Sequence, residues 1–427
     1  MQLRTVALVL AAAAPLVGCG DDGATAPHPC EGVTGPCTRL EAGASGEAVL
    51  TAFLQAQDGD TIGFGQGRYD LDRDLSLTVS GVTLLGTGKG DDGSVLSFAA
   101  STGAQGVLIT GDRSRVEGLA VIDTPGDALK WEGVDGVTVR EVRTAWTGAP
   151  RAENGAYGIY PVQCQNVLIE DSEARGASDA GIYVGQSDNI IVRRNLAHDN
   201  VAGIEIENST RADVYANTAT KNTGGVLVFS LPGLQIANGA GTRVFDNQII
   251  DNNTLNFAPA GNIVADVPTG SGVILLAGHQ VEIFDNVIEN HSSLQIGIAG
   301  YNLTTRPFTD PNYNPFSDAI SIHDNDIRGV ATMPSGPLGF LIVMALLEMG
   351  QSAGNLMVPS VIWDGDADPT KVDGTGELMA QYKICVKNNT LTDFGNLRVP
   401  LGSGATPTTD AAPHNCDLPA IPAVTLP

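Results

Sequence analysis

The chain has 427 residues, a formal net charge of −25 at pH 7 and only 5% aromatic residues. The negative charge argues against nucleic acid as a partner, and it disfavours a polyanionic substrate unless cations bridge the contact. Glycine is abundant, with 52 residues. This composition suits a fold with many tight corners around a narrow core of Val, Ile and Ala.

Residues 1–18 have the features of a signal peptide. One basic residue, Arg4, precedes an apolar run over 6–17 that is too short to span a bilayer. The run ends in LVGC at 16–19, which resembles the lipobox of bacterial lipoproteins. That resemblance implies a lipid-modified Cys19 that anchors an exported protein to a membrane, at the periplasm or the cell surface. The alternative is an ordinary cleaved signal, and either one permits disulfides.

A flexible tether is expected over residues 19–44, because Gly, Ala, Asp and Pro dominate this part. Cys30 and Cys37 enclose a small loop within it. We predict a local disulfide there, since no His or further Cys stands at metal-ligand spacing. The folded part then begins with a short amphipathic helix over 45–56, whose apolar side includes Leu54, and this helix would cap the open end of the fold.

Three repeats between residues 156 and 217 determine the fold prediction. Each has a glycine, an alternating strand, a second strand, and a small polar residue 14 positions after the glycine. The glycines are Gly158, Gly181 and Gly203, and the polar residues are Ser172, Asn195 and Asn217. A period of roughly 20–50 residues marks a repeat architecture, and these repeats are rich in β-branched residues at period two. We predict an all-β, single-stranded parallel β-helix over residues 45–399, in one monomeric domain.

Asparagine recurs at the same place in later coils. The set is Asn195, Asn217, Asn247, Asn286, Asn325 and Asn389. Asparagine tolerates the left-handed conformation that turns a corner, and in-register amides can hydrogen-bond from coil to coil. We therefore expect these residues to adopt that conformation and to form a ladder.

The repeat region resembles a family of exported bacterial proteins named only as parallel β-helix repeat-containing proteins. The similarity covers about residues 45–420 and includes the runs AGIYVGQSDNIIVRRN and AGIEIENS. It implies a right-handed parallel β-helix, as does the general handedness of parallel crossovers. It implies no reaction, because that family has no established activity.

A second, more distant resemblance concerns the segment YGIYPV at 157–162. It is similar to the Tyr-Gly-x-Asp-Pro-His motif of mannuronan C5-epimerases, whose fold is also that of pectate-lyase-like proteins. Tyr160 stands where those enzymes have the Asp, and Val162 stands where they have the His. The epimerase acid/base pair is therefore absent at these positions.

An outward-facing ladder is the candidate site. If residues such as Ile159 point into the core, their neighbours point out from successive coils. The candidate catalytic residues are Lys130, Tyr160, Tyr183 and Glu205, and the candidate substrate-binding residues are Tyr157, Tyr160, Tyr183, Glu205 and Glu207. Tyr or Lys can act as a general base, Tyr can stack on a sugar, and Glu can hold a cation. The alternative is an ordinary solvent-facing sheet.

Irregular insertions follow the regular coils. The loop 301–317 concentrates aromatic residues that would either stack on sugar rings or cover the side of the solenoid. The apolar run 340–347 is too short to cross a membrane, and we expect it to pack on the coils as a strand or helix. Cys385 and Cys416 would form a second disulfide that pins the tail, residues 400–427, to the last coils.

One acidic segment resembles a calcium loop. It contains Asp364, Asp366 and Asp368, but Pro369 and Thr375 stand where an EF-hand needs Gly and a bidentate Glu. A solvated acidic turn is the alternative. Calcium is the one cofactor that the sequence suggests.

The sequence leaves three functions open. The first is binding or processing of a carbohydrate at the cell envelope, with lyase- or epimerase-like chemistry. The second is a non-catalytic surface adhesin or scaffold, and the third is an accessory protein for another envelope component. The fold alone does not decide between them.

Overall fold

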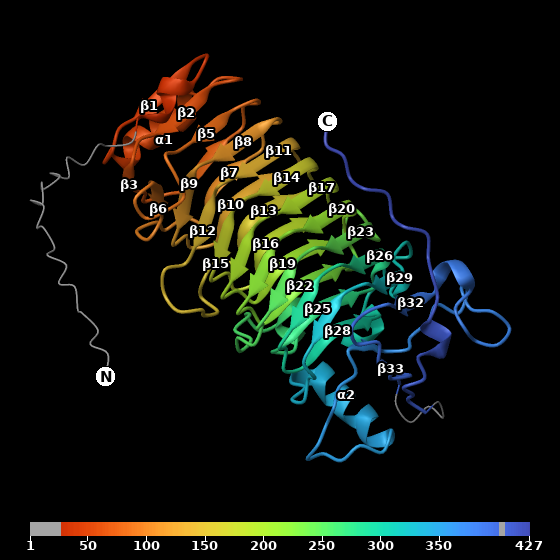
Figure 1. Cartoon of the computed structure of the whole chain (residues 1–427). Coiled ribbons are helices and arrows are strands. Elements are labelled where there is room, and N and C mark those ends of the chain that lie inside the picture. Colours follow the sequence, from red (N-terminus) through yellow and green to blue (C-terminus); the bar gives the residue numbers. More distant parts are fainter. Residues whose placement is uncertain (1–26, 401–405) are drawn as a thin grey trace, which may run out of the picture.

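The computed structural model describes residues 27–400 and 406–427, and its strands form three parallel sheets that wind around one axis (Figure 1). The signal peptide and Cys19 lie outside the described residues. Each regular coil contributes one strand to sheet A, the next to sheet B and the third to sheet C. The predicted parallel β-helix is confirmed.

The strands stack in the following order along the axis. Sheet A contains β1 (Cys37–Leu40), β2 (Thr61–Phe64), β5 (Thr83–Leu85), β8 (Ser114–Glu117), β11 (Asp135–Arg140), β14 (Gln165–Glu170), β17 (Asp188–Arg193), β20 (Thr210–Tyr215), β23 (Ala240–Phe245), β26 (His279–Phe284), β29 (Asp318–His323) and β32 (Ile384–Lys387). Sheet B contains β3 (Gly67–Asp70), β6 (Ser94–Ser97), β9 (Leu119–Ile122), β12 (Arg143–Ala145), β15 (Glu173–Arg175), β18 (Leu196–His198), β21 (Thr218–Thr220), β24 (Gln248–Ile250), β27 (Val287–Glu289) and β30 (Asp326–Arg328). Sheet C contains β4 (Leu75–Leu77), β7 (Gln105–Ile109), β10 (Asp127–Glu132), β13 (Tyr157–Val162), β16 (Ala180–Gly185), β19 (Ala202–Glu207), β22 (Gly224–Phe229), β25 (Ser271–Leu276), β28 (Leu294–Ala299), β31 (Val361–Trp363) and β33 (Phe394–Asn396).

The hydrophobic core runs along the axis between the three sheets. Neighbouring coils pair in register, so that Ile159 lies beside Ile182, and Ile182 beside Ile204. All three side chains are fully buried. Burial of each one stabilises the fold by about 1.5–3 kcal/mol relative to exposure.

The predicted asparagine ladder is confirmed. Side-chain amides join Asn195, Asn217, Asn247, Asn286, Asn325 and Asn389 in sequence, with Nδ2 to Oδ1 distances of 2.8–3.0 Å. The expected backbone conformation is wrong, however. The left-handed residue is the one before each asparagine, such as Arg194 (φ 56°) and Ala216 (φ 53°), because the asparagine must turn its amide inward while the preceding residue makes the corner.

A second amide ladder lies between sheets B and C, and the spacing used above does not predict it. Asn200 donates to Asn222 at 3.0 Å, and Asn222 donates to Asn252 at 2.9 Å. The ladder ends at His291, whose Nε2 is 3.2 Å from the Asn252 amide nitrogen. Each member follows a member of the first ladder by five residues, so the signal is present in the sequence.

Helix α1 (Gly46–Gln55) packs at the N-terminal end of the coils (Figure 1). The Ser45 hydroxyl accepts the backbone N–H of Ala48 in the first turn at 3.2 Å, and Val49 and Phe53 are buried. The predicted apolar side is wrong at Leu54, which is 74% exposed, because it follows Phe53 by about 100° around the helix.

The first coil begins earlier than predicted. Strand β1 pairs in parallel with β2, so residues 37–40 belong to the β-helix and not to a tether over 19–44. A disulfide joins Cys30, in the short helix η1 (Pro29–Gly32), to Cys37 at the start of β1. This crosslink attaches the segment before β1 to an edge strand of only four residues.

The C-terminal tail runs back along sheet A from β32 towards β17, beyond the last coils on which it was expected (Figure 1). A disulfide between Cys385 and Cys416 fixes its start. Its backbone contacts are Ile421 N–H to Glu282, Val424 N–H to Asp213, and the Thr425 carbonyl to Asn189, at 3.1–3.2 Å. These partners lie on β26, β20 and β17, so the tail joins coils that are distant along the axis.

Insertions cover the outer face of sheet C in its later coils. They contain the short helices η2 (Ile263–Asp266) and η3 (Tyr301–Thr304) and the helix α2 (Gly336–Glu348), which lies below β28 in Figure 1. Their buried apolar residues form one cluster with the sheet. The apolar run 340–347 belongs to α2, so of the two expected forms it adopts the helix. Two further short helices, η4 (Ala380–Tyr382) and η5 (Ala412–His414), lie near the C-terminus. Within the described residues, no helix has the length and apolarity to cross a membrane.

Candidate functional site

Sheet C brings the predicted ladder together on its outer face. Lys130 pairs with Tyr160, and Tyr183 pairs with Glu205. A parallel row two positions further along contains Glu132, Val162, Gly185 and Glu207. These residues come from β10, β13, β16 and β19, so the repeat frame alone places them next to one another.

Only the first two coils of this ladder are accessible. Lys130 and Tyr160 are partly exposed, whereas Tyr183, Glu205 and Glu207 are 4%, 1% and 8% exposed. The prediction of an open ladder is therefore wrong for the last three residues. They do point away from the core, but the insertion that follows β24 packs on this face, where Asn262 donates to Asp179 and Val264 joins the buried cluster that contains Tyr183.

Three tyrosines form the floor of the site where the open and covered parts meet. The ring centroids of Tyr157 and Tyr160 are 4.4 Å apart, those of Tyr157 and Tyr183 are 4.6 Å apart, and those of Tyr160 and Tyr183 are 5.0 Å apart. A Cβ at Gly185 would lie 2.3 Å from the Tyr183 ring, so glycine is needed there. Because Gly185 has no side chain, the Tyr183 ring can lie over it, and the Tyr183 hydroxyl donates to Glu207 at 2.6 Å.

The tyrosine hydroxyls are protonated in this environment. Burial, followed by the charges of nearby carboxyl groups, raises the pKa of Tyr157, Tyr160 and Tyr183 well above its ordinary value. A phenol in this state donates a hydrogen bond and holds its proton. The geometry therefore disfavours the general-base role expected for Tyr160 and Tyr183.

Three carboxyl groups lie buried behind the tyrosines. Asp179 accepts from the Tyr157 hydroxyl at 3.3 Å and from the Asn262 amide at 3.4 Å, and Glu207 accepts from a tyrosine as described. Neither carboxyl oxygen of Glu205 has a hydrogen-bond partner. Within the described residues no Lys or Arg forms an ion pair with any of the three, as the ion pairs found there involve other carboxylates.

Burial controls the protonation of this group. It raises the pKa of Asp179 to about 7, with the charge of Glu207 adding to the effect, and it raises the pKa of Glu207 to about 7. Burial also raises the pKa of Glu205 well above its ordinary value, with a further contribution from Asp179. Asp179 and Glu207 therefore exchange protons near neutral pH, which is where an acid/base group is most effective.

A fourth titratable carboxyl stands at the open edge. Burial raises the pKa of Asp127 to about 6, although the nearby charge of Lys130 acts in the opposite direction. Lys130 forms an ion pair with Glu132 at 3.1 Å and lies 5.3 Å from the centre of the Tyr160 ring. Asp127 and Asp179 were not predicted. Asp127 begins its strand as Tyr157 begins the next one, and this shared register could have identified it.

Each of the three aspartates predicted to bind calcium accepts a hydrogen bond from a different protein group. Asp364 accepts the Gly300 N–H at 2.6 Å, and burial raises its pKa to about 7. Asp366 accepts a side-chain amide at 2.9 Å, and Asp368 accepts the Thr370 N–H at 2.9 Å. In the part of the chain that the structure describes, no three His, Cys, Asp or Glu side chains gather in a way that could hold a metal ion.

The aromatic loop acts as a cover. Tyr301, Phe308 and Tyr313 pack edge to face against one another, with centroid distances of 5.3–5.7 Å. Tyr301 and Tyr313 are 7% and 6% exposed. No ring face of these two residues is therefore open to a sugar, and of the two alternatives for this loop the covering role is the one observed.

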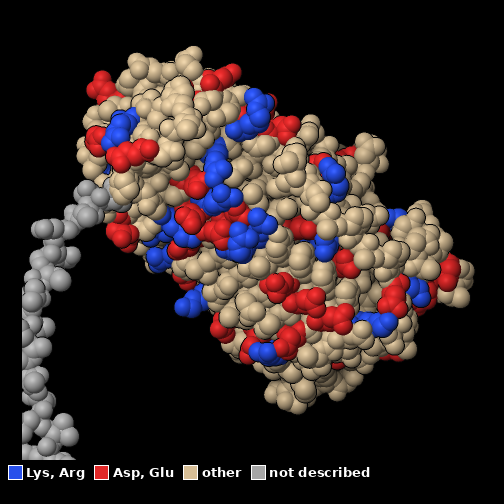
Figure 2. All heavy atoms as spheres, turned by 45° about the horizontal axis from the view of Figure 1, so that its top comes forward, with Lys and Arg blue, Asp and Glu red and all other residues tan. Residues whose placement is uncertain are grey.

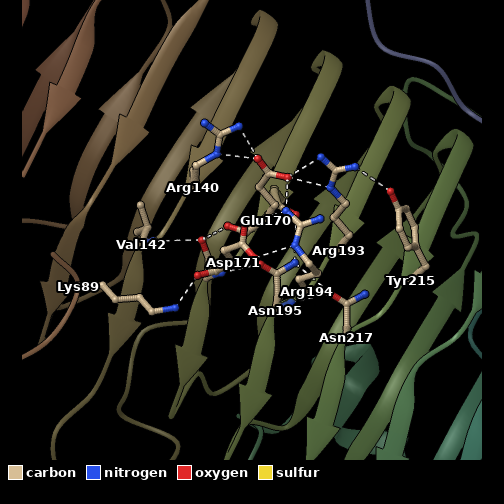
Figure 3. Close-up of polar contacts among 12 residues, drawn as sticks. Lys89, Arg140, Val142, Glu170, Asp171, Arg193, Arg194, Asn195, Tyr215 and Asn217 are labelled. Carbon is tan, nitrogen blue, oxygen red and sulfur yellow. Dashed lines mark hydrogen bonds and ion pairs between the residues drawn. The ribbon is translucent and has the colours of Figure 1, made fainter. Parts of the chain in front are cut away.

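A different polar network lies on sheet A. Figure 2 shows acidic and basic side chains side by side across the middle of the molecular surface, and Figure 3 shows one network in detail. Glu170 accepts from Arg140 at 2.6 Å and from Arg193 and Arg194 at 2.7 Å. Burial alone would raise the Glu170 pKa, but the three guanidinium groups hold it below its ordinary range. This network is held by ion pairs among its own side chains.

The comparisons with known proteins agree with this architecture. Residues 92–239 match the family model described as "Right handed beta helix region". The A-module of the mannuronan C-5 epimerase AlgE4 of Azotobacter vinelandii superposes with a TM-score of 0.50 at 14% identity, covering 80% of this chain and 90% of that one. The chain is a right-handed parallel β-helix.

Other solved structures share less of the geometry. The A-module of the A. vinelandii mannuronan C-5 epimerase AlgE6 has a TM-score of 0.45 at 15% identity and covers 75% of this chain and 86% of that one. The pectate lyase Pel9A has a TM-score of 0.36 at 11% identity and covers 73% and 83%. No curated protein matches the sequence significantly. At these identities the likeness concerns the fold.

Proposed function

We propose that this β-helix is an exported protein that binds a carbohydrate on the open part of sheet C. The observation that carries the proposal is the meeting of Lys130, Tyr160 and Tyr157 with titratable carboxyl groups at one edge of the covered face. Aromatic rings beside hydrogen-bonding charged groups suit a sugar, which presents apolar ring faces and hydroxyls. The epimerase likeness is consistent with this ligand class.

The charge at the site favours a neutral glycan. Asp127 and Glu132 carry two negative charges near pH 7, against one positive charge on Lys130. A uronate would therefore need a divalent cation to offset the repulsion, and calcium is the cation that we propose for that case. Lys130 and the Tyr160 hydroxyl would donate to sugar oxygens, while the ring of Tyr160 would contact the apolar sugar face.

Processing of the glycan would depend on proton transfer. Asp127 is the carboxyl at the open edge whose pKa, about 6, suits exchange of a proton near neutrality. Asp179 and Glu207 could take over the proton if the insertion moved aside. A lyase- or epimerase-like reaction on the sugar would use such a group, whereas a surface adhesin would need only the binding contacts.

Titration of neutral and uronate oligosaccharides, with calcium and with EDTA, tests the proposal. We expect Tyr160→Ala and Lys130→Ala to weaken binding by roughly tenfold. Lys221→Ala is the matched control, because Lys221 is exposed and lies after β21 on sheet B. An assay for unsaturated uronate products, with Asp127→Asn as the inactive variant, separates processing from binding. Unchanged binding by folded Tyr160→Ala and Lys130→Ala proteins would contradict the site.

Membrane anchoring through Cys19 is a separate proposal. The lipobox-like LVGC at 16–19 supports it. Replacing Cys19 with Ser should move the protein from the membrane fraction to the soluble fraction and remove the lipid mass from its N-terminus. A wild-type protein that is already soluble and carries no lipid by mass spectrometry would exclude the anchor.

A further inference from the structure

The outer face of sheet C changes from charged to apolar along the axis. After Glu205, its row continues with Leu227 and Ile274, and after Glu207 the next row continues with Phe229 and Leu276. These four residues are at most 6% exposed. An outer face with such side chains needs a cover, because large contiguous apolar patches are uncommon on soluble proteins.

Three insertions supply the cover, but they leave a cavity of about 560 Å³ between themselves and the sheet. The floor is formed by Phe229, Ile274, Leu276 and Ala299. The walls are formed by residues around η2, including Asp266, by the end of η3 with Thr304, and by the start of α2 with Phe340. A cavity of this size falls in the range of small-molecule sites, about 300–1,000 Å³.

Two polar groups of the lining, the Asp266 carboxylate and the Thr304 hydroxyl, are already bound to the protein. Asp266 forms an ion pair with Arg306 at 2.8 Å, and the same guanidinium donates to the carbonyls of Gly261 and Asn262 at 2.9 and 3.0 Å. The Thr304 hydroxyl donates to a backbone carbonyl at 2.8 Å. A charged ligand would meet no unpaired partner among these groups and would lose its hydration.

The apolar lining also hydrates poorly, because water in such a space has few polar partners. Phe340 stands in the wall with 64% of its surface exposed, although the opposite side of α2 buries Ile342 and Leu346. A hydrocarbon ligand would replace weakly bound water and cover part of the Phe340 ring, and both changes favour binding.

We propose that this cavity is a binding site for a neutral, largely hydrocarbon small molecule, such as a fused-ring compound or the alkyl chain of a fatty alcohol. The site is independent of the proposed glycan site. Its floor lies three to five coils beyond Tyr160 along sheet C, and it shares no lining residue with the glycan site.

Fluorescence titration with N-phenyl-1-naphthylamine, a neutral apolar probe, tests the inference on the full folded chain. We expect saturable binding with one site per molecule and displacement by 1-dodecanol. Phe340→Ser should weaken binding by roughly tenfold, since burial of such a ring contributes on the order of a factor of ten. Ala299→Leu should weaken it further by filling the floor of the cavity. Leu255→Ser is the matched control, because Leu255 is 79% exposed and outside the lining.

Several results would overturn the inference. One is the absence of saturable probe binding by the wild type. Another is equal affinity of the wild type, Phe340→Ser and Ala299→Leu, with unchanged melting temperatures. A third comes from sedimentation with phosphatidylcholine vesicles: vesicle binding that is lost in Phe340→Ser, without any probe binding, would make this surface a membrane contact and not a ligand site.

Discussion

Two glutamates on the outer faces of neighbouring coils, Glu170 and Glu205, have the same exposure and opposite surroundings. Each is 1% exposed. Glu170 on sheet A is held by three arginines (Figure 3), whereas neither oxygen of Glu205 on sheet C has a partner. Their pKa values accordingly move in opposite directions, below the ordinary range for Glu170 and above it for Glu205.

The difference follows from what buries each side chain. The partners of Glu170 come from adjacent coils of its own sheet, since Arg140 and Arg193 pair with it directly. Glu205 is buried by an insertion from later in the chain, and its neighbours there are tyrosines and other carboxyl groups. A buried charge without a partner is costly, so the cluster of Glu205 keeps protons and the network of Glu170 does not. Unpaired groups of this kind concentrate at functional sites.

Removal of the charge from the satisfied network should have the largest effect. We expect Glu170→Gln to lower the free energy of unfolding by about 3–4 kcal/mol, because it breaks a buried ion network whose arginines are still partly solvated. Glu117→Gln is the control, as Glu117 lies in the same row and is more exposed, with a cost below about 1 kcal/mol. Urea unfolding measures both, and equal losses would show that the network does not hold sheet A together.

The sequence was sufficient for the features that repeat. Glycine spacing, alternating strands and the asparagine positions predict the parallel β-helix, its register and the first amide ladder, because each depends on contacts between equivalent positions of adjacent coils. The register also brings Lys130 and Tyr160 together as predicted. The left-handed residue was misplaced by one position, since the corner and the ladder are made by different residues.

The features that do not repeat could not be predicted from the sequence. The burial of Glu205 and Glu207 depends on an insertion about fifty residues later, and periodicity carries no information about where such an insertion packs. The same holds for the tail, whose contacts with Asp213 and Asn189 span more than two hundred residues. Asp127 was accessible to register reasoning, but its altered pKa results from burial that only the folded chain reveals.

His291, at the end of the second amide ladder, is a buried titratable group whose pKa moves in the direction opposite to that of Glu205. Its Nε2 must accept from Asn252, so Nδ1–H donates to Gln295 at 2.7 Å. Burial lowers its pKa from 6.5 to about 4. The unfolded chain therefore takes up the proton first, and stability present above pH 6.5 is lost as the pH falls towards 4, on the order of 3 kcal/mol.

His291→Asn should remove that loss, because an amide can end the ladder without titrating. Unfolding measured at pH 7 and at pH 4.5 for both proteins checks this expectation. A variant whose stability falls as steeply as that of the wild type would assign the acid sensitivity to other groups.

A break in the first ladder should cost less. We expect Asn217→Leu to lower the free energy of unfolding by roughly 1–3 kcal/mol, since it removes the acceptor of the Asn195 backbone N–H, one of two acceptors of the Asn195 side-chain amide, and a donor to the Val192 carbonyl. Asn253→Leu is the matched change at an exposed position, where the cost should stay below about 1 kcal/mol. Thermal melts of the two variants compare them, and identical melting temperatures would deny the ladder a stabilising role.

The smallest expected effect is a gain in stability, and it concerns Glu205. Its folded pKa is raised, so at low pH both the folded and unfolded states hold the proton. As the pH rises above the ordinary glutamate value, only the unfolded chain releases its proton, and stability falls by about 1.4 kcal/mol per pH unit. Glu205→Gln removes this term while keeping the shape of the side chain. The variant should therefore gain stability relative to the wild type when the pH is raised from 5 to 7, whereas Glu170→Gln should lose stability at both values. A variant that is destabilised equally at the two pH values would mean that the Glu205 carboxylate is ionised and has a partner, and the contrast between the two glutamates would then fail.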